Sequence, residues 1–288
     1  MKQIVCEMCN SSDFLKRDGV FVCQHCGCKY SVEEAKKMMI EGIVDVSGST
    51  VKVDNTSFVQ KYLENARRAK QKTDWEEVEK YYNMVEQNDP QNIEAIFYSA
   101  YGKVMLSLTE SDRFKRDQKF DVFGRSISII DDHYDPNRSD ELIPLIEAMS
   151  DDLIRLTRSG YVYTATKYSN DSSYTKDMMF KVEQKFIETI KNIIKKDNKP
   201  KLYYVLRRQY ENLILNKNLD DNTREQYVEK LEECNNTLKK IDPSYRPSGQ
   251  AVATFRKEQE KKRKDARDGW IMAIIWFAIV FICYLMGE

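Results

Sequence analysis

Between residues 57 and 241, apolar residues recur every three to four positions, as on the buried face of an amphipathic helix. The few prolines, such as Pro90, Pro136 and Pro200, stand where one helix would end and the next begin. The pattern predicts helices near 57–72, 75–88, 91–108, 112–132, 140–158, 175–196, 200–217 and 222–240. Residues 160–168 do not follow it, and we expect a strand-like excursion or a long loop there.

The first 55 residues have the shorter period of β-strands. An Asp-Gly pair at 18–19 followed by Val-Phe-Val at 20–22 is typical of a hairpin turn and its second strand. The Ser-x-x-Glu sequence at 31–34 is a capping box and predicts a short helix that ends near Gly42. Alternating apolar and polar residues at 43–53 predict a further small hairpin.

The end of the chain carries an uncharged apolar run at 270–286. As a helix, about 17 residues would extend ~25 Å, slightly less than the ~30 Å hydrocarbon core of a bilayer. Trp270 and Tyr284 suit the two membrane interfaces, and basic residues are frequent over 256–267. We therefore predict a single-pass, tail-anchored protein of the cell membrane, with the body before residue 270 on the cytoplasmic side.

Composition limits the classes of function. The 288 residues are 41% apolar and 32% charged, with 46 basic and 46 acidic side chains. Such a balance does not indicate a globally basic nucleic-acid-binding protein. The chain also lacks a glycine-rich phosphate loop, a Gly-x-Ser-x-Gly elbow and a Cys/His pair outside its first 30 residues, so we do not expect an enzyme.

Two Cys-x-x-Cys pairs, Cys6 with Cys9 and Cys23 with Cys26, dominate the first 30 residues. Two intervening residues allow a tight turn to aim both sulfurs of a pair at one point, and two such turns complete the tetrahedral four-thiolate site that Zn²⁺ favours. The four cysteines are therefore predicted to bind one zinc ion. Cys28 lies next to the second pair and is not expected to be a ligand.

The stretch 6–30 resembles the zinc ribbon of the transcription factor IIB type. Together with its continuation through residue 39, it is similar to bacterial proteins that begin with this ribbon and continue into a helical-repeat body and sometimes a membrane helix. The resemblance implies that the same four cysteines occupy the ligand positions. Asn10 departs from the glycine often found after the first pair.

Residues 58–92 resemble one tetratricopeptide repeat. Tyr62 and Ala66 occupy the large and small positions of the first helix, Trp75 begins the second, and Pro90 closes the unit. Because a lone repeat cannot bury both of its faces, we expect the later helices to stack in a solenoid-like or irregular bundle.

The predicted fold is mainly α, with a small N-terminal β zinc ribbon, a tetratricopeptide-like body and a C-terminal transmembrane helix. The expected divisions are a ribbon with a short helix at 1–42, a hairpin connector at 43–55, a helical domain at 56–241, a linker and charged segment at 242–269, and the membrane helix at 270–286.

These features predict a membrane-anchored adaptor that recruits a protein partner through its ribbon and helical repeats. A membrane-tethered nucleic-acid-binding or transcription-linked factor is the alternative. Residues 1–55 contain seven basic and eight acidic side chains, a net charge of −1, which does not favour phosphate binding. A protein partner is therefore the preferred expectation.

Overall fold

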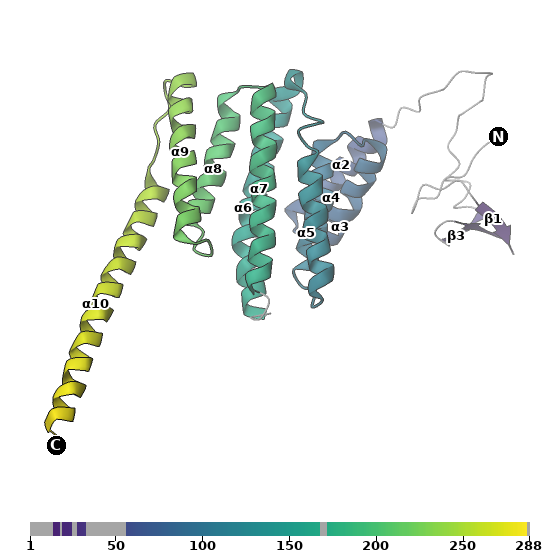
Figure 1. The fold of residues 1–288 in the computed structure, drawn as a ribbon. Helices are drawn as coiled ribbons and strands as arrows, with labels where there is room; N and C mark the ends of the chain where they lie inside the picture. The colour runs from purple at the N-terminus through teal and green to yellow at the C-terminus, as the bar shows by residue number, and fades with distance from the viewer. Residues whose placement is uncertain (1–13, 18, 25–27, 33–55, 168–171, 287–288) are drawn as a thin grey trace. The chain divides into compact units, whose positions relative to one another are not determined.

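The computed structural model describes residues 14–17, 19–24, 28–32, 56–167 and 172–286. The chain divides into two compact units, Met1–Asn55 and Thr56–Glu288, and each is considered by itself. The first contains a small antiparallel sheet and the second is helical (Figure 1). The prediction of a mainly helical protein with a small N-terminal β module is confirmed.

The sheet contains three strands in the order β1-β2-β3, with the bounds β1 Phe14–Arg17, β2 Val20–Cys23 and β3 Lys29–Ser31. Arg17 pairs with Val20 across the turn, where Gly19 has φ 79°, a left-handed value that glycine adopts without strain. The predicted hairpin is therefore confirmed. The helix expected after Ser31 and the hairpin at 43–53 lie outside the described residues.

The second unit is built from helices joined by short connections. Their bounds are α2 Thr56–Gln71, α3 Trp75–Asn88, α4 Ile93–Ser107, α5 Arg113–Ser128, η1 Pro136–Arg138, α6 Ser139–Lys167, α7 Ser172–Lys196, α8 Pro200–Leu215, α9 Asp221–Ile241 and α10 Gln250–Met286. Side-chain caps fix several of the starts. Asp74, Asn92, Asp112 and Asp220 each accept a hydrogen bond from a backbone N–H of the first turn that follows.

One predicted break does not exist. Helix α6 continues through Lys167, so the loop or strand expected from residue 160 is wrong over 160–167, and Tyr168 lies outside the described residues. This segment contains Gly160, yet a glycine inside a helix costs only about 1 kcal/mol relative to alanine. The long helix tolerates that cost.

The helices pack as successive antiparallel pairs, α2 with α3, α4 with α5, α6 with α7 and α8 with α9 (Figure 1). The first members of neighbouring pairs also touch, because α4 contacts α6, α6 contacts α8 and α8 contacts α10. The second members of neighbouring pairs touch as well. Helix α5 contacts α7, and the ring of Phe180 on α7 contacts that of Tyr227 on α9. A continuous apolar core runs through the pairs.

Helix α10 begins against the preceding pair. Phe255 is fully buried, and the guanidinium of the buried Arg224 on α9 lies 4.2 Å from the centre of its ring. Arg224 also donates to the backbone oxygen of Ile214 at 2.7 Å and to Glu258 at 3.0 Å. Further along α10, Lys262 pairs with Asp221 at 2.8 Å. Arginine and lysine contacts thus attach the first part of α10 to α8 and α9.

The second part of α10 corrects the membrane prediction. Across the described portion of the chain, no helix is long and apolar enough to cross a membrane. The predicted transmembrane helix at 270–286 is therefore wrong, and so are the tail-anchored membrane localisation, the cytoplasmic placement of the body and the integral membrane partner that were derived from it. About 17 uncharged residues fall short of the ~20 that a span requires, and the helix is densely charged up to Asp268. Trp270, Trp276 and Phe277 are exposed.

A buried carboxylate joins α6, α7 and α8. Glu183 is fully buried and accepts hydrogen bonds from Thr157 at 3.0 Å and Asn212 at 2.5 Å, while its Oε2 has no hydrogen-bond partner. Arg158 donates to the other side of Asn212 at 2.7 Å. Burial raises the pKa of Glu183 to about 7, because the charged form is poorly solvated there.

This raised pKa predicts a stability change with pH. The folded protein holds a proton on Glu183 that the unfolded chain, with a pKa near its usual 4.5, has released, so stability is lost as the pH rises from about 4.5 to 7. Glu183→Gln should remove this loss. At pH 8 its free energy of unfolding by urea should exceed that of the wild type by on the order of 2–3 kcal/mol, and its urea midpoint should be higher, whereas at pH 4.5 the two proteins should differ little. Equal urea midpoints at pH 8 would contradict the assignment.

Candidate functional site

A cavity of about 470 Å³ lies among α2, α3, α4 and α6, and we call it the aromatic–basic pocket. Its size is in the range of sites that take a small ligand or a few side chains of a partner. Aromatic and aliphatic residues form most of its wall, and two cations and a carboxylate stand at one side. The lining residues are Lys70, Thr73, Trp75, Tyr101, Met105, Leu108, Thr109, Asp152, Arg155 and Leu156.

The carboxylate of Asp152 organises the polar side of the pocket. Its Oδ2 lies 2.8 Å from Nζ of Lys70 and accepts a 2.8 Å hydrogen bond from the hydroxyl of Tyr98. Its Oδ1 lies 3.2 Å from Arg155, and its backbone oxygen accepts from the hydroxyl of Tyr101 at 3.2 Å. Asp152 is nearly buried, so these contacts act in an environment where a charge needs partners.

The two cations differ in freedom. The Lys70 side chain is 27% exposed and lies over the ring of Tyr98, 3.8 Å from its centre, whereas the Arg155 side chain is 74% exposed. Burial and the neighbouring Asp152 both raise the pKa of Tyr98, which keeps its hydroxyl protonated as a hydrogen-bond donor. The pocket therefore offers one fixed and one adaptable positive charge beside an apolar wall.

The apolar wall is formed around Trp75 and Tyr101. Their ring centres are 5.6 Å apart in an edge-to-face arrangement, and both belong to elements anchored in the core. Met105 is partly buried beside them, and Leu156 is buried. Such a wall can take up a flat aromatic or a branched aliphatic side chain.

Thr73 at the edge of the pocket has a strained backbone. It connects α2 to α3 with φ 57°, a left-handed value that β-branched residues rarely adopt. Its hydroxyl lies 2.7 Å from the backbone oxygen of Lys72. Strain of this kind costs on the order of 1–3 kcal/mol and tends to occur at functional sites. It therefore supports the pocket as the candidate functional site.

The structure describes one of the four predicted zinc ligands. Cys6, Cys9 and Cys26 lie outside the described residues, whereas Cys23 ends β2 and its side chain is fully buried. The backbone N–H of Cys23 donates to the oxygen of Cys28 at 2.9 Å, and Val22 pairs with Lys29. This register closes a short loop between β2 and β3, where the second Cys-x-x-Cys pair lies. A buried sulfur at its start fits a thiolate ligand set.

No complete metal site is present among the described residues. There, no group of three or more His, Cys, Asp or Glu side chains is placed to hold a metal ion. The zinc site is thus not found in the described part of the chain, which contains one of its four predicted cysteines.

The sequence did not reveal the aromatic–basic pocket. Lys70, Tyr98 and Asp152 are far apart along the chain and meet only through the packing of α2, α4 and α6. The one local signal was the spacing of Asp152 and Arg155, three residues apart on one helix, and the partners from α2 and α4 could not be identified from it.

Comparison with protein-family models, curated proteins and solved structures finds no match for this chain. The resemblance to zinc-ribbon proteins therefore stays a prediction.

Removing the Asp152 carboxylate should destabilise the fold. Asp152→Ala leaves Lys70 and the buried Tyr98 hydroxyl without their shared acceptor, and we expect a loss of about 3 kcal/mol in the free energy of unfolding by urea. The matched control is Glu141→Ala, which removes an exposed ion pair with Arg138 and should cost below about 0.5 kcal/mol. Similar losses for the two variants would mean that Asp152 does not hold the helices together.

Proposed function

We propose that this protein is a scaffold that binds a protein partner through the aromatic–basic pocket of its helical body, with a zinc-stabilised ribbon at its N-terminus. The aromatic–basic pocket carries the proposal. An apolar side chain of the partner would lie against Trp75 and Tyr101, while a neighbouring carboxylate would pair with Lys70 and Arg155. Aromatic and arginine side chains are the residue types that dominate binding at protein interfaces.

The arrangement of the helices supports this role. Antiparallel pairs whose first members contact one another are typical of tetratricopeptide-like arrays, in which those first helices offer a binding surface. The aromatic–basic pocket is lined largely by first members, α2, α4 and α6. The site thus lies where such an array would receive a peptide segment.

The ribbon part of the proposal rests on the four cysteines. Cys6, Cys9, Cys23 and Cys26 would bind Zn²⁺ through thiolates, and the metal would stabilise the small module without taking part in chemistry. The buried position of Cys23 supports this assignment. A nucleic-acid partner is not favoured, since the net charge of −1 over residues 1–55 gives phosphate little attraction.

Blocking the aromatic–basic pocket should abolish partner binding. Thr109→Trp places an indole at the pocket from an exposed position, and Arg155→Glu reverses its adaptable charge. In crosslinking pull-downs from native lysate, the polypeptides captured by the wild type should fall at least about tenfold for each variant. Thr109→Trp should keep the wild-type thermal midpoint within a few degrees. Arg155→Glu places a second carboxylate beside Asp152 and should lower the midpoint, so Thr109→Trp shows whether the loss of capture is independent of stability.

The control for this experiment is Arg138→Glu. Arg138 is exposed and lies outside the pocket, and the substitution breaks its ion pair with Glu141. It should capture the same polypeptides as the wild type. If Thr109→Trp and Arg155→Glu also capture them undiminished, the pocket is not the binding site. Salt-sensitive retention of DNA or RNA by residues 1–55 would instead favour a nucleic-acid function.

Zinc binding is tested by metal analysis of the reduced protein. We expect one zinc per chain, because structural zinc contributes on the order of 10 kcal/mol to small sites. Cys6→Ser or Cys26→Ser should lose the metal and expose the N-terminal module to proteolysis while the helical unit stays folded. Cys28→Ser is the matched control and should keep its zinc. A metal-free wild type, freshly purified and reduced, would refute the site.

A further inference from the structure

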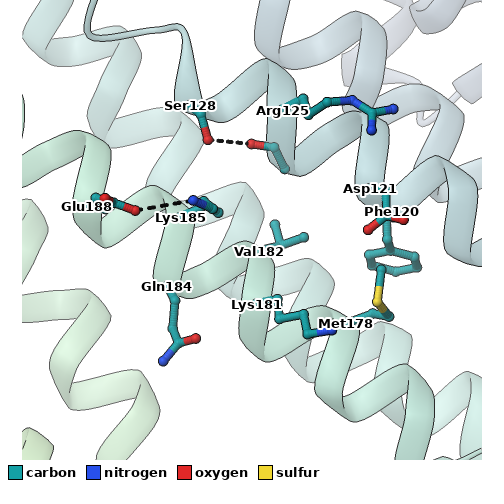
Figure 2. A pocket seen from close by; sticks show the side chains of 11 residues that line it. Phe120, Asp121, Arg125, Ser128, Met178, Lys181, Val182, Gln184, Lys185 and Glu188 are labelled. Atoms are coloured by element: carbon teal, nitrogen blue, oxygen red, sulfur yellow. Dashed lines mark hydrogen bonds and ion pairs between the residues drawn. The ribbon is translucent and has the colours of Figure 1, made fainter.

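A second hollow, of about 580 Å³, lies between α5 and α7, and we call it the α5–α7 groove. Figure 2 shows the side chains that these two helices contribute to it. It shares no lining residue with the aromatic–basic pocket. Its floor and its rim have different chemistry, and together they indicate what it could bind.

The floor is apolar. Phe120 from α5 and Met178 and Val182 from α7 are buried at its base, and they also belong to the core. These side chains are therefore held in place by packing on their other sides. They give the groove a rigid apolar surface against which an incoming side chain can be desolvated.

Gly124 leaves space above this floor. A Cβ added there would meet nothing within 4 Å, although glycine is a poor residue for the interior of a helix. At Gly102 the opposite holds, because a Cβ would lie 3.0 Å from the backbone nitrogen of Glu79, so close packing of α3 against α4 accounts for that glycine. Gly269 also faces open space, but it does not line the α5–α7 groove. Internal packing does not account for Gly124, whereas room for an occupant does.

The rim is positively charged. Helix α5 carries five basic and two acidic residues and α7 carries six and three, a net charge of +3 for each helix as a whole. The lining of the groove itself carries three basic and two acidic side chains, a net charge of +1. At the α5–α7 groove itself, Lys185 pairs with Glu188 at 3.4 Å. Arg125 and Lys181 are exposed and form no ion pair within the described residues. Two cations are thus available to a ligand that approaches the floor.

We propose that the α5–α7 groove binds an acidic amphipathic segment of a protein partner, with an apolar side chain above Gly124 and carboxylates on Arg125 and Lys181. This inference rests on the proposed protein-binding function and adds a second contact surface to it. The apolar side chain would pack on Phe120, Met178 and Val182. The net charge of α5 and α7 would attract the acidic segment over a distance of about one Debye length.

A nucleic acid fits the α5–α7 groove less well. The one aromatic side chain of the groove, Phe120, is buried and offers no face for a base to stack on. An acidic helix can place its carboxylates on the side of the two unpaired cations.

The test uses the full chain and a defined probe, a fluorescein-labelled helical peptide with leucines along one face and glutamates elsewhere. A matched peptide with glutamine in place of every glutamate shows how much of the binding affinity comes from the negative charges. Three variants are compared with the wild type. They are Gly124→Leu, which fills the hollow, the double variant Arg125→Glu with Lys181→Glu, and Thr109→Trp, which blocks the aromatic–basic pocket and leaves the lining of the α5–α7 groove unchanged. Fluorescence anisotropy gives the dissociation constants.

We expect the glutamate peptide to bind the wild type at least about fivefold more tightly than the glutamine peptide, with a gap that narrows as salt is raised. Gly124→Leu and the charge-reversed variant should each weaken binding by about tenfold, whereas Thr109→Trp should not. The urea midpoint of Gly124→Leu should not fall below that of the wild type, because leucine favours a helix more than glycine does. Weaker binding without lower stability is a result that a purely structural role for Gly124 would not produce.

Three results would overturn the inference. They are no binding of the glutamate peptide, unchanged binding by both α5–α7 groove variants, and competition by RNA that displaces the peptide from the wild type but not from the charge-reversed variant. If Thr109→Trp weakens binding of the peptide while the α5–α7 groove variants do not, the peptide binds at the aromatic–basic pocket. The proposed function would then stand, and the α5–α7 groove would be excluded as a binding site.

Discussion

The carboxylate of Asp152 connects three helices that are far apart in the sequence. Lys70 from α2, Tyr98 from α4 and Arg155 from its own helix, α6, all converge on it. Bringing such distant segments together costs chain entropy, and a nearly buried charge is stable only when its partners are in place. The contacts are therefore mutually dependent. The same set of contacts holds Lys70, the fixed cation of the aromatic–basic pocket, beside its aromatic wall, so the packing of α2, α4 and α6 and the shape of the site have one origin.

Buried polar groups recur along the helical array. Glu94 accepts from Arg67 and Tyr82, Glu183 accepts from Thr157 and Asn212, and Arg224 bonds α8 and α10. Apolar faces of similar helices could pack in several orders, because the hydrophobic effect is not directional. A buried polar group accepts only the neighbour that satisfies it. These networks consequently select one order of helices, and Glu183 does so at the expense of stability at alkaline pH.

The sequence was most informative where a local chemical rule decides the structure. Proline at the start of α8 and the Asp-Gly turn before β2 gave element ends within a few residues. It failed at 160–167, where the apolar period is lost in the sequence and α6 nevertheless continues. It failed again at 270–286, where an apolar run too short for a bilayer was taken as a span. Neither the aromatic–basic pocket nor the α5–α7 groove could be predicted, since contacts between distant helices leave no periodic trace in a single sequence.

The attachment of α10 has a mechanical consequence. Its 37 residues form one uninterrupted helix about 55 Å long, whose first part is fixed to α8 and α9 by Arg224, Phe255 and Lys262. A helix without an internal break resists bending, so it acts as a lever. A small rotation of the exposed aromatic end would be transmitted along the helix to Glu258. From there it would reach Arg224 and, through the hydrogen bond of Arg224, the backbone oxygen of Ile214. Load applied at one end of the array would thus be felt in the pair of helices farthest from the aromatic–basic pocket along the chain.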